Sequence, residues 1–279
     1  REILQEHHLV DTIKKAVTKR MLDSLKVLKK ESFDKYKDFW NEYGLVLKEG
    51  PAEDRENKDT IASLLLFAST YANSKDCDQT LDDYLERMGD DQDKIYFCVA
   101  DTYEAAANSP HIEGLKSKGI EVLLLTDRID EWVMAGLMEY QGKELINVAK
   151  EDIVDEETKK VSEGDQEIIS KIQKHLGDKV SDVIISKRLT DSASCIVLPK
   201  HEPGAQLRKI LEASGQTLGS SNPIFEINMK HKLVKKLKDM KGKQFNSFVD
   251  FLYDYAVIAE GGSPQDPSKY LRQLDKYLS

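Results

Sequence analysis

The sequence has few cysteines, and the three that it has are far apart. Cys77, Cys98 and Cys195 are odd in number, so neither a disulfide framework nor a CxxC metal pair is expected. No run approaches the roughly 18 apolar residues that a membrane-spanning helix needs. No N-x-S/T sequon occurs, and no charged-then-apolar leader opens the chain. These absences predict a reducing, cytoplasmic environment and no membrane partner.

Motifs for catalysis and nucleotide binding are also missing. The chain contains no GxxxxGK[ST], GxGxxG, HExxH or GxSxG pattern, and none of its six histidines pairs with a cysteine at metal-ligand spacing. The sequence therefore predicts that this chain is not itself an enzyme and that it holds no metal and no cofactor. An enzyme built on residues 95–148 would need a pocket with a perturbed acid or base, and the sequence names none.

Charged residues are abundant and acidic ones are in excess. Lys and Arg number 41 and Asp and Glu number 50, which gives a net charge of −9. This balance disfavours a protein that coats nucleic acid. The lysine-rich segments 14–30 and 229–243 keep a nucleic-acid-binding module as the alternative function. Apolar residues share these segments and aromatic residues for base stacking are missing from 229–243, so a solvated helix face and no nucleic acid are expected.

Hydrophobic periodicity predicts a first domain over residues 1–150. Helices are expected within 1–90, at 9–30, 33–44, 59–71 and 79–88, and Gly44 is expected to end the second of them. A small α/β unit follows at 94–150, with strands at 95–100, 120–127 and 143–150 and a helical stretch at 128–140. Strands and helices that alternate at this spacing predict a small parallel sheet with right-handed crossovers.

The charged segment 151–165 predicts a linker, and residues 166–279 a second domain. Its expected elements are a helix at 166–176, a hairpin of strands 183–189 and 194–199, a helix at 204–214, a strand at 224–229, a helix at 231–240 and two closing helices. The last helix is expected to start at Asp266 and Pro267, an N-cap followed by proline. The predicted fold class is α+β, with a mixed α/β C-terminal domain and a helical-bundle dimer interface.

Two apolar features exceed ordinary core needs. The closing helices are rich in aromatic residues, and two copies could form a four-helix bundle. The candidate dimer contacts are Phe248, Leu252, Tyr255, Leu271, Leu274 and Leu278. The helix at 204–214 carries Leu207, Ile210 and Leu211, which form either a core-facing stripe or a surface for partner proteins.

Seven long stretches of the chain resemble the heat-shock protein 90 chaperones, most closely their bacterial branch of the high-temperature protein G type. They are REILQ (1–5), FWNEYGLVLKEGPAED (39–54), LLLFAST (64–70), KIYFCVAD (94–101), NSPHIEGLKSKGIEVLLLTDRIDEW (108–132), ISKRLTDSASCIV (185–197) and IFEIN (224–228). The resemblance implies the C-terminal part of the family's middle domain, up to residue 150, followed by its C-terminal dimerisation domain. It implies a chaperone fragment that binds partly folded client proteins, forms homodimers and supports the ATP-driven cycle of the full-length protein.

The resemblance also assigns roles to single residues. Arg1 and Gln5 match the family residues that contact the γ-phosphate, so ATP and Mg are expected in the full-length protein only. The family's client-contacting segment matches the region around Asp130, Glu131 and Trp132, although a polar position of that surface is Ala135 here.

Leu207, Ile210 and Leu211 resemble the family's client-facing helix. Pro203 departs from the pattern, since bacterial relatives often carry a large, flexible apolar residue there. A co-chaperone of the seventy-kilodalton heat-shock system is a further partner that the resemblance implies.

Overall fold

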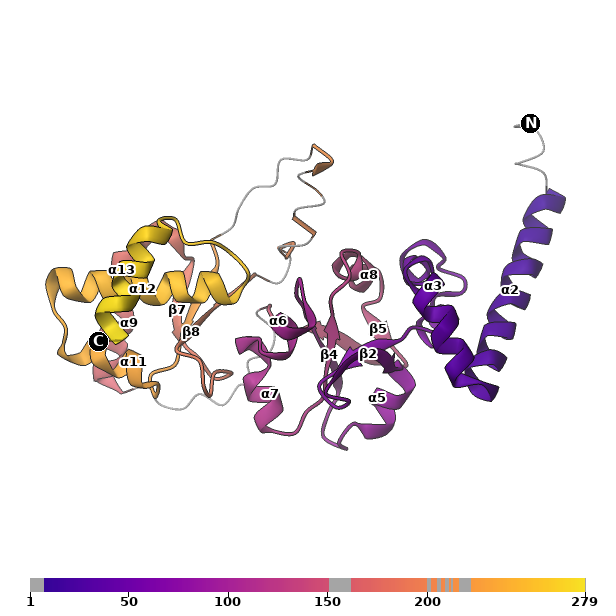
Figure 1. Ribbon diagram of the computed structural model, residues 1–279, viewed down its shortest axis with the longest axis horizontal. Helices are drawn as coiled ribbons and strands as arrows, with labels where there is room; N and C mark the ends of the chain where they lie inside the picture. The colour runs from indigo at the N-terminus through magenta and orange to yellow at the C-terminus, as the bar shows by residue number, and fades with distance from the viewer. Residues whose placement is uncertain are drawn as a thin grey trace.

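The computed structural model describes residues 8–150, 162–199, 202–204, 207–208, 211, 213–215 and 222–278. Two parts lie side by side along the long axis, and the first and last described helices lie toward opposite ends (Figure 1). Helix α2 (His8–Glu31) projects from the end of the first part, and the closing helices belong to the second part. Within the described ranges, every helix is too short or too polar to cross a membrane.

The first part is built on a six-stranded sheet. Its strands are β1 (Phe67–Ser69), β2 (Ser74–Gln79), β3 (Lys94–Val99), β4 (Val122–Leu125), β5 (Glu139–Tyr140) and β6 (Lys143–Asn147). Its helices are α2 (His8–Glu31), α3 (Phe33–Glu53), α4 (Lys58–Ala62), α5 (Leu81–Arg87), α6 (Tyr103–Ala107), η1 (Pro110–Ile112), α7 (Glu113–Ser117) and α8 (Asp130–Gly136). The strand order is β2-β1-β4-β3-β6-β5, and β3 runs parallel to both β4 and β6. The predicted parallel unit is therefore confirmed, and antiparallel strands extend it at both edges.

Helix α3 continues through Gly44 and ends at Glu53, so the prediction that Gly44 ends a short helix is wrong. The reason for the glycine is packing against the ring of Trp40. A Cβ on Gly44 would lie 2.8 Å from Cδ2 of that ring, closer than real Cβ atoms come to a neighbour. Gly44 thus makes room for a buried tryptophan one turn earlier on the same helix.

The predicted helix at 59–71 is also wrong over most of its length. Helix α4 stops at Ala62, and the chain enters β1 at Phe67. Leu64, Leu65 and Leu66 are completely buried between these elements. A continuous apolar run fits a buried helix and a buried strand equally well, so periodicity alone could not distinguish them.

The second part combines a three-stranded sheet with α-helices and 3-10 turns. The elements are α9 (Glu163–Leu176), η3 (Gly177–Lys179), β7 (Asp182–Ile185), β8 (Ser194–Val197), β9 (Ile224–Ile227), α11 (Lys232–Lys235) with η4 (Lys236–Asp239), α12 (Gly242–Ala259) and α13 (Pro267–Leu278). Helix α9 starts three residues earlier than expected, because Ser162 caps it by accepting the Asp165 N–H. The predicted helix at 231–240 is a short α-helix followed by a 3-10 turn.

The predicted hairpin of β7 and β8 is wrong, because β9 lies between them. The strand order is β7-β9-β8, in which β7 is parallel and β8 antiparallel to β9. The loop between β7 and β8 instead contacts the first part. The carboxylate of Glu113 accepts the backbone N–H groups of Thr190, Asp191 and Ser192 at 2.7–3.1 Å.

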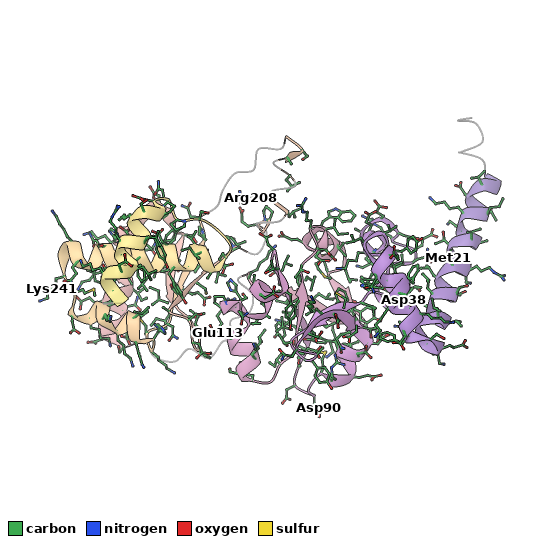
Figure 2. All side chains as sticks on the ribbon, in the orientation of Figure 1. Met21, Asp38, Asp90, Glu113, Arg208 and Lys241 are labelled. Carbon is green, nitrogen blue, oxygen red and sulfur yellow. The ribbon has the colours of Figure 1, made fainter. Side chains whose placement is uncertain are left out.

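Each part has its own apolar core, and polar contacts join the two parts. Among the described residues, no buried apolar cluster mixes residues before 150 with residues after 162. Besides Glu113, which Figure 2 shows at the junction, Arg188 donates to the carbonyl of Val148 at 2.6 Å. His111 Nε2 lies 2.7 Å from Glu260 Oε1. The junction is thus specified by polar contacts, most of them to backbone groups.

Candidate functional site

A buried lysine fixes the start of α8, the helix that carries Trp132. Lys48 on α3 places its Nζ 2.6 Å from Oδ2 of Asp127 and 2.7 Å from Oδ1 of Asp130. The other oxygen of Asp130 accepts the Asp127 N–H at 2.9 Å, which closes the turn before α8. The Lys48 side chain is only 4% exposed and that of Asp130 is fully buried. The N-terminus of α8 is therefore tied to α3 by a buried ion pair.

The electrostatics of this triad follow from burial and pairing. Burial alone would lower the pKa of Lys48, but the nearby Asp130 and Asp127 carboxylates outweigh it and raise that pKa above its ordinary value. Burial raises the pKa of the Asp130 carboxyl, and Lys48 opposes that rise. Both groups therefore depend on each other, since either one left alone would be a buried, unpaired charge.

The next two residues of α8 lie in different environments. The Trp132 side chain is 37% exposed. Glu131 is only 6% exposed, and its carboxylate accepts the N–H of Gly204 through Oε1 and that of Leu207 through Oε2, the latter at 3.0 Å. Leu207 and Leu211 are half-buried and helical. The structure thus brings the predicted Trp132 and Leu207 regions together, although 75 residues separate them.

Not every predicted client contact is visible in this arrangement. Ile210 lies outside the described residues, as do Arg1 and Gln5. The Glu131 carboxylate is turned toward the backbone of the 204–215 segment, so in this conformation it is engaged within the chain. The roles predicted for these residues stay predictions.

The candidate dimer residues divide into a core set and a surface set. Phe248 and Leu252 are fully buried within the chain's own core, whereas Leu271 is 58% exposed. Tyr255 and Leu274 are half-buried, and Leu278 is the last residue of α13, with a side chain outside the described set.

Aromatic packing explains which side of α13 faces outward. Tyr277 packs edge-on against Phe248 with ring centroids 4.6 Å apart, and Tyr270 stacks on Phe251 at 5.3 Å. These contacts seat one face of α13 on α12. Leu271 is next to Tyr270 in sequence but is exposed, so it lies on the face of α13 that does not pack on α12. A predicted interface with a second copy would therefore be centred on Leu271.

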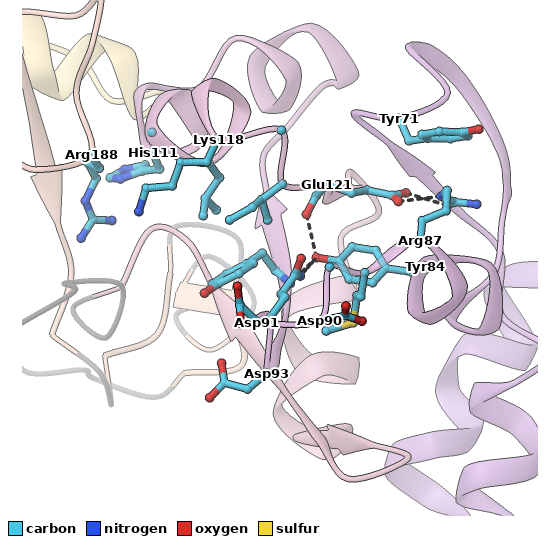
Figure 3. A pocket seen from close by; sticks show the side chains of 18 of the residues that line it. Tyr71, Tyr84, Arg87, Asp90, Asp91, Asp93, His111, Lys118, Glu121 and Arg188 are labelled. Carbon is cyan, nitrogen blue, oxygen red and sulfur yellow. Dashed lines mark hydrogen bonds and ion pairs between the residues drawn. The ribbon is translucent and has the colours of Figure 1, made fainter.

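A cleft of about 790 Å³ lies at the junction of the two parts (Figure 3). Arg87 binds the Glu121 carboxylate through two hydrogen bonds of 2.8 and 2.9 Å, and the Tyr84 hydroxyl donates to the Glu121 carbonyl at 2.6 Å. Arg188 lies 3.1 Å from Glu226. No group of three metal-ligating side chains occurs in the described ranges. Arg87, Glu121, Arg188 and Glu226 thus have structural partners within the chain.

The sequence analysis misses Lys48 and Glu113, two residues that build the contacts described above. The buried face of α3 repeats every four residues, through Tyr36, Trp40 and Gly44, and the same step leads to Lys48. That spacing could have placed the lysine inside. Glu113 has no comparable signal, because the amides that it binds lie 77–79 residues further along the chain.

Comparisons with known proteins agree on one family. A family model described as "Hsp90 protein" matches residues 1–279. The chain is 44% identical to the chaperone protein HtpG of Colwellia psychrerythraea, and 43% and 44% identical to those of Shewanella loihica and Shewanella halifaxensis. Each match covers 100% of this chain and 44–45% of the relative. The chain therefore spans less than half the length of these curated relatives.

Proposed function

The chain belongs to the Hsp90 protein family, and from that premise we propose that it binds partly folded client proteins and forms homodimers. The observation that carries the client-binding proposal is the meeting of α8 with the 204–215 segment. There the exposed Trp132 lies next to Glu131, which holds Leu207. A chaperone needs apolar surface that its own core does not consume, and Trp132, Leu207 and Leu211 supply such surface.

The size of this surface fits weak, reversible binding. Complete burial of one leucine contributes roughly 1.5–3 kcal/mol by transfer from water. Leu207 and Leu211 are half-buried before any client arrives, so each can contribute only part of that value. Association and the ordering of a flexible client oppose the gain. Weak binding suits a protein that must release its client.

Serine substitutions test the client surface directly. We expect Leu207→Ser with Leu211→Ser to reduce the suppression of aggregation of an unfolded model protein while leaving the melting temperature nearly unchanged. If these leucines belong to a core, each change instead costs about 2–5 kcal/mol. Leu252→Ser, at a fully buried position, is the matched control that should lower the melting temperature. A comparable drop in the double variant, or undiminished suppression, would overturn the proposal.

We further propose that ATP hydrolysis belongs to the longer protein and that Arg1 and Gln5 contact the γ-phosphate there. A guanidinium can neutralise the charge that develops on a transferring phosphoryl group. Titration of this chain with Mg-ATP should therefore give no heat of binding. In the longer protein, Arg1→Ala should slow hydrolysis and leave nucleotide affinity nearly unchanged, because the contact strengthens in the transition state. Micromolar binding of Mg-ATP to this chain would contradict the proposal.

The remaining partners and the place of action stay at the level of proposal. A co-chaperone of the seventy-kilodalton heat-shock system is expected from the resemblance, and a cytoplasmic location from the few, widely spaced cysteines. The alternative of a nucleic-acid-binding module has no support from the matched relatives, which are named as chaperones. A salt series distinguishes the two functions, because phosphate-driven binding weakens steeply with salt and apolar client binding does not.

A further inference from the structure

The described residues of the 204–215 segment begin a helical turn, and among them no side chain of the segment itself caps that turn. The Gly204 carbonyl accepts the Arg208 N–H at 2.9 Å, so Gly204 occupies the N-cap position and Leu207 is the third residue of the turn. Helices commonly satisfy the free amides at these positions with a polar N-cap side chain and a Glu or Gln at the third position. Glycine and leucine can supply neither group.

Glu131 supplies the missing cap from the other part of the molecule. Its two carboxylate oxygens accept the N–H groups of Gly204 and Leu207, which are the two amides that a capping box satisfies. The side chain is almost fully buried, so little water competes for these bonds. One carboxylate of α8 therefore completes the start of a helical turn 73 residues away.

The glycine at position 204 is consistent with a carboxylate that caps the turn at close range. A Cβ at this position would lie 2.6 Å from Oε1 and 2.8 Å from Oε2 of Glu131, which is sterically impossible without movement. The backbone of Gly204 does not adopt the left-handed conformation that favours glycine. The close approach of the carboxylate thus leaves no room for a Cβ at position 204 unless the end of the Glu131 side chain shifts.

A charge pair beside the cap fixes the same segment. Arg208 donates to the Glu202 carboxylate at 2.8 Å, across the turn that contains Gly204. Figure 2 shows Arg208 on the segment that rises between the two parts. The local ion pair holds the shape of the turn, whereas Glu131 holds its position relative to α8.

We propose that Glu131 is a latch that joins α8 to the 204–215 segment and so assembles one surface for unfolded polypeptide from Trp132, Leu207 and Leu211. When the latch is closed, Leu207 is hydrogen-bonded to Glu131, which is the neighbour of Trp132 on α8. When it is open, the segment loses its cap and the two halves of the surface separate. Glu131 is therefore a positioning residue, and the functional half of the proposal rests on the proposed client binding.

Three variants test the latch from both sides. Glu131→Gln replaces one acceptor by an N–H donor that faces a backbone N–H. Gly204→Ala places a Cβ where the Glu131 carboxylate lies and so disrupts the contact while Glu131 itself is unchanged. Glu131→Ala with Gly204→Asp gives the turn a carboxylate of its own but no link to α8. Amide exchange at Gly204 and Leu207 measures the cap, and fluorescence anisotropy of a labelled, permanently unfolded polypeptide measures client affinity.

In Glu131→Gln and Gly204→Ala, the amide hydrogens of residues 204 and 207 should exchange about tenfold faster, as expected for the loss of a charged cap. They should also bind the polypeptide about fivefold more weakly, because the competent arrangement is then populated less. The double variant should recover slow exchange at Leu207 and not client affinity, which a purely local capping role would restore.

The outcomes separate the latch from the client surface. Unchanged amide exchange in Glu131→Gln and Gly204→Ala would overturn the latch. Faster exchange with unchanged client affinity would overturn its functional half. If Leu207→Ser with Leu211→Ser leaves client affinity unchanged while the exchange results hold, the proposed client surface fails and the cap itself remains supported.

Discussion

Replacing Lys48 with methionine should destabilise the first part of the molecule severely. The change keeps the apolar stem of the side chain but leaves Asp130, which is fully buried, and Asp127 as unpaired neighbours. Breaking a buried ion pair by removing one partner typically costs about 3–5 kcal/mol. Whole-domain stabilities are about 5–15 kcal/mol, so this is a large fraction of the total. At about 2–4 °C per kcal/mol for a chain of this size, the melting temperature should fall by about 6–20 °C.

The fluorescence of Trp40 can report this unfolding. Lys48 Nζ lies 5.9 Å from the centroid of the Trp40 ring, so the probe sits beside the perturbed site. A Trp132→Phe background removes the other tryptophan. Lys15→Met is the matched control, because Lys15 pairs with Glu56 at 2.8 Å but both side chains are about two-thirds exposed, at 66% and 68%. Exposed pairs contribute little to stability, so this control should melt like the parent.

A repair variant separates the buried charges from other effects of the substitution. Lys48→Met with Asp127→Asn and Asp130→Asn removes all three charges and should recover part of the lost stability, because no buried carboxylate is then left unpaired. If Lys48→Met melts within about 2 °C of the parent, the triad does not stabilise α8 and the reasoning is refuted. An equal drop in Lys15→Met would point to net charge instead.

The closing helices and the cap of α11 give two further predictions. Leu271→Asp should yield monomers in light scattering at low micromolar concentration without lowering the melting temperature. The control Leu252→Ala, at a buried position, should lower the free energy of unfolding by about 2–5 kcal/mol. If Leu271→Asp stays dimeric, the interface lies elsewhere. His231 caps α11 by accepting the Leu233 N–H on Nδ1 at 3.2 Å, and burial lowers the pKa of His231 below its ordinary 6.5. The stability that this cap gives is therefore fully present above pH 6.5, and it is lost as the pH falls through the lowered pKa of His231. The protection factor of the Leu233 amide should therefore depend on pH. His231→Asn should keep the cap and abolish this pH dependence, and an unchanged pH dependence would exclude His231 as its source.

Local patterns were sufficient to predict elements that depend on neighbours in sequence. The apolar runs at 95–100, 120–127 and 143–150 form β3, β4 and β6, which are parallel as their spacing requires. The start of α13 follows the predicted cap, since Asp266 Oδ1 accepts the Lys269 N–H at 2.9 Å. In both cases the information lies within a few residues or one crossover.

Features that depend on distant partners could not be read in this way. Strand β9 enters between β7 and β8, although the loop between those two strands is short enough for a hairpin. That loop is held by Glu113, and no pattern within 186–192 indicates a carboxylate from so far upstream. The inward turn of Glu131 is similar, because the resemblance assigns it to a surface but its partners are backbone amides of another segment.

One copy of the proposed client surface is too small to hold a client tightly. Trp132 is already 63% covered, being 37% exposed, and its leucine neighbours are half-buried. Association costs about 4 kcal/mol or more before any net affinity appears. Two copies in the proposed dimer would change this balance, because a client bound to one copy would meet the second at a high effective concentration.

Dimerisation should therefore matter for long clients and not for short ones. Leu271→Asp should weaken the binding of an unfolded polypeptide that can bridge both copies by about 10²-fold, the lower end of the gain expected from linked sites. The same variant should bind a short apolar peptide as the parent does, because such a peptide contacts one copy only. Fluorescence anisotropy with the two labelled clients measures both affinities. Equal losses for the two would mean that Leu271 contributes to the client surface itself, and no loss for either would mean that the two copies do not share a client.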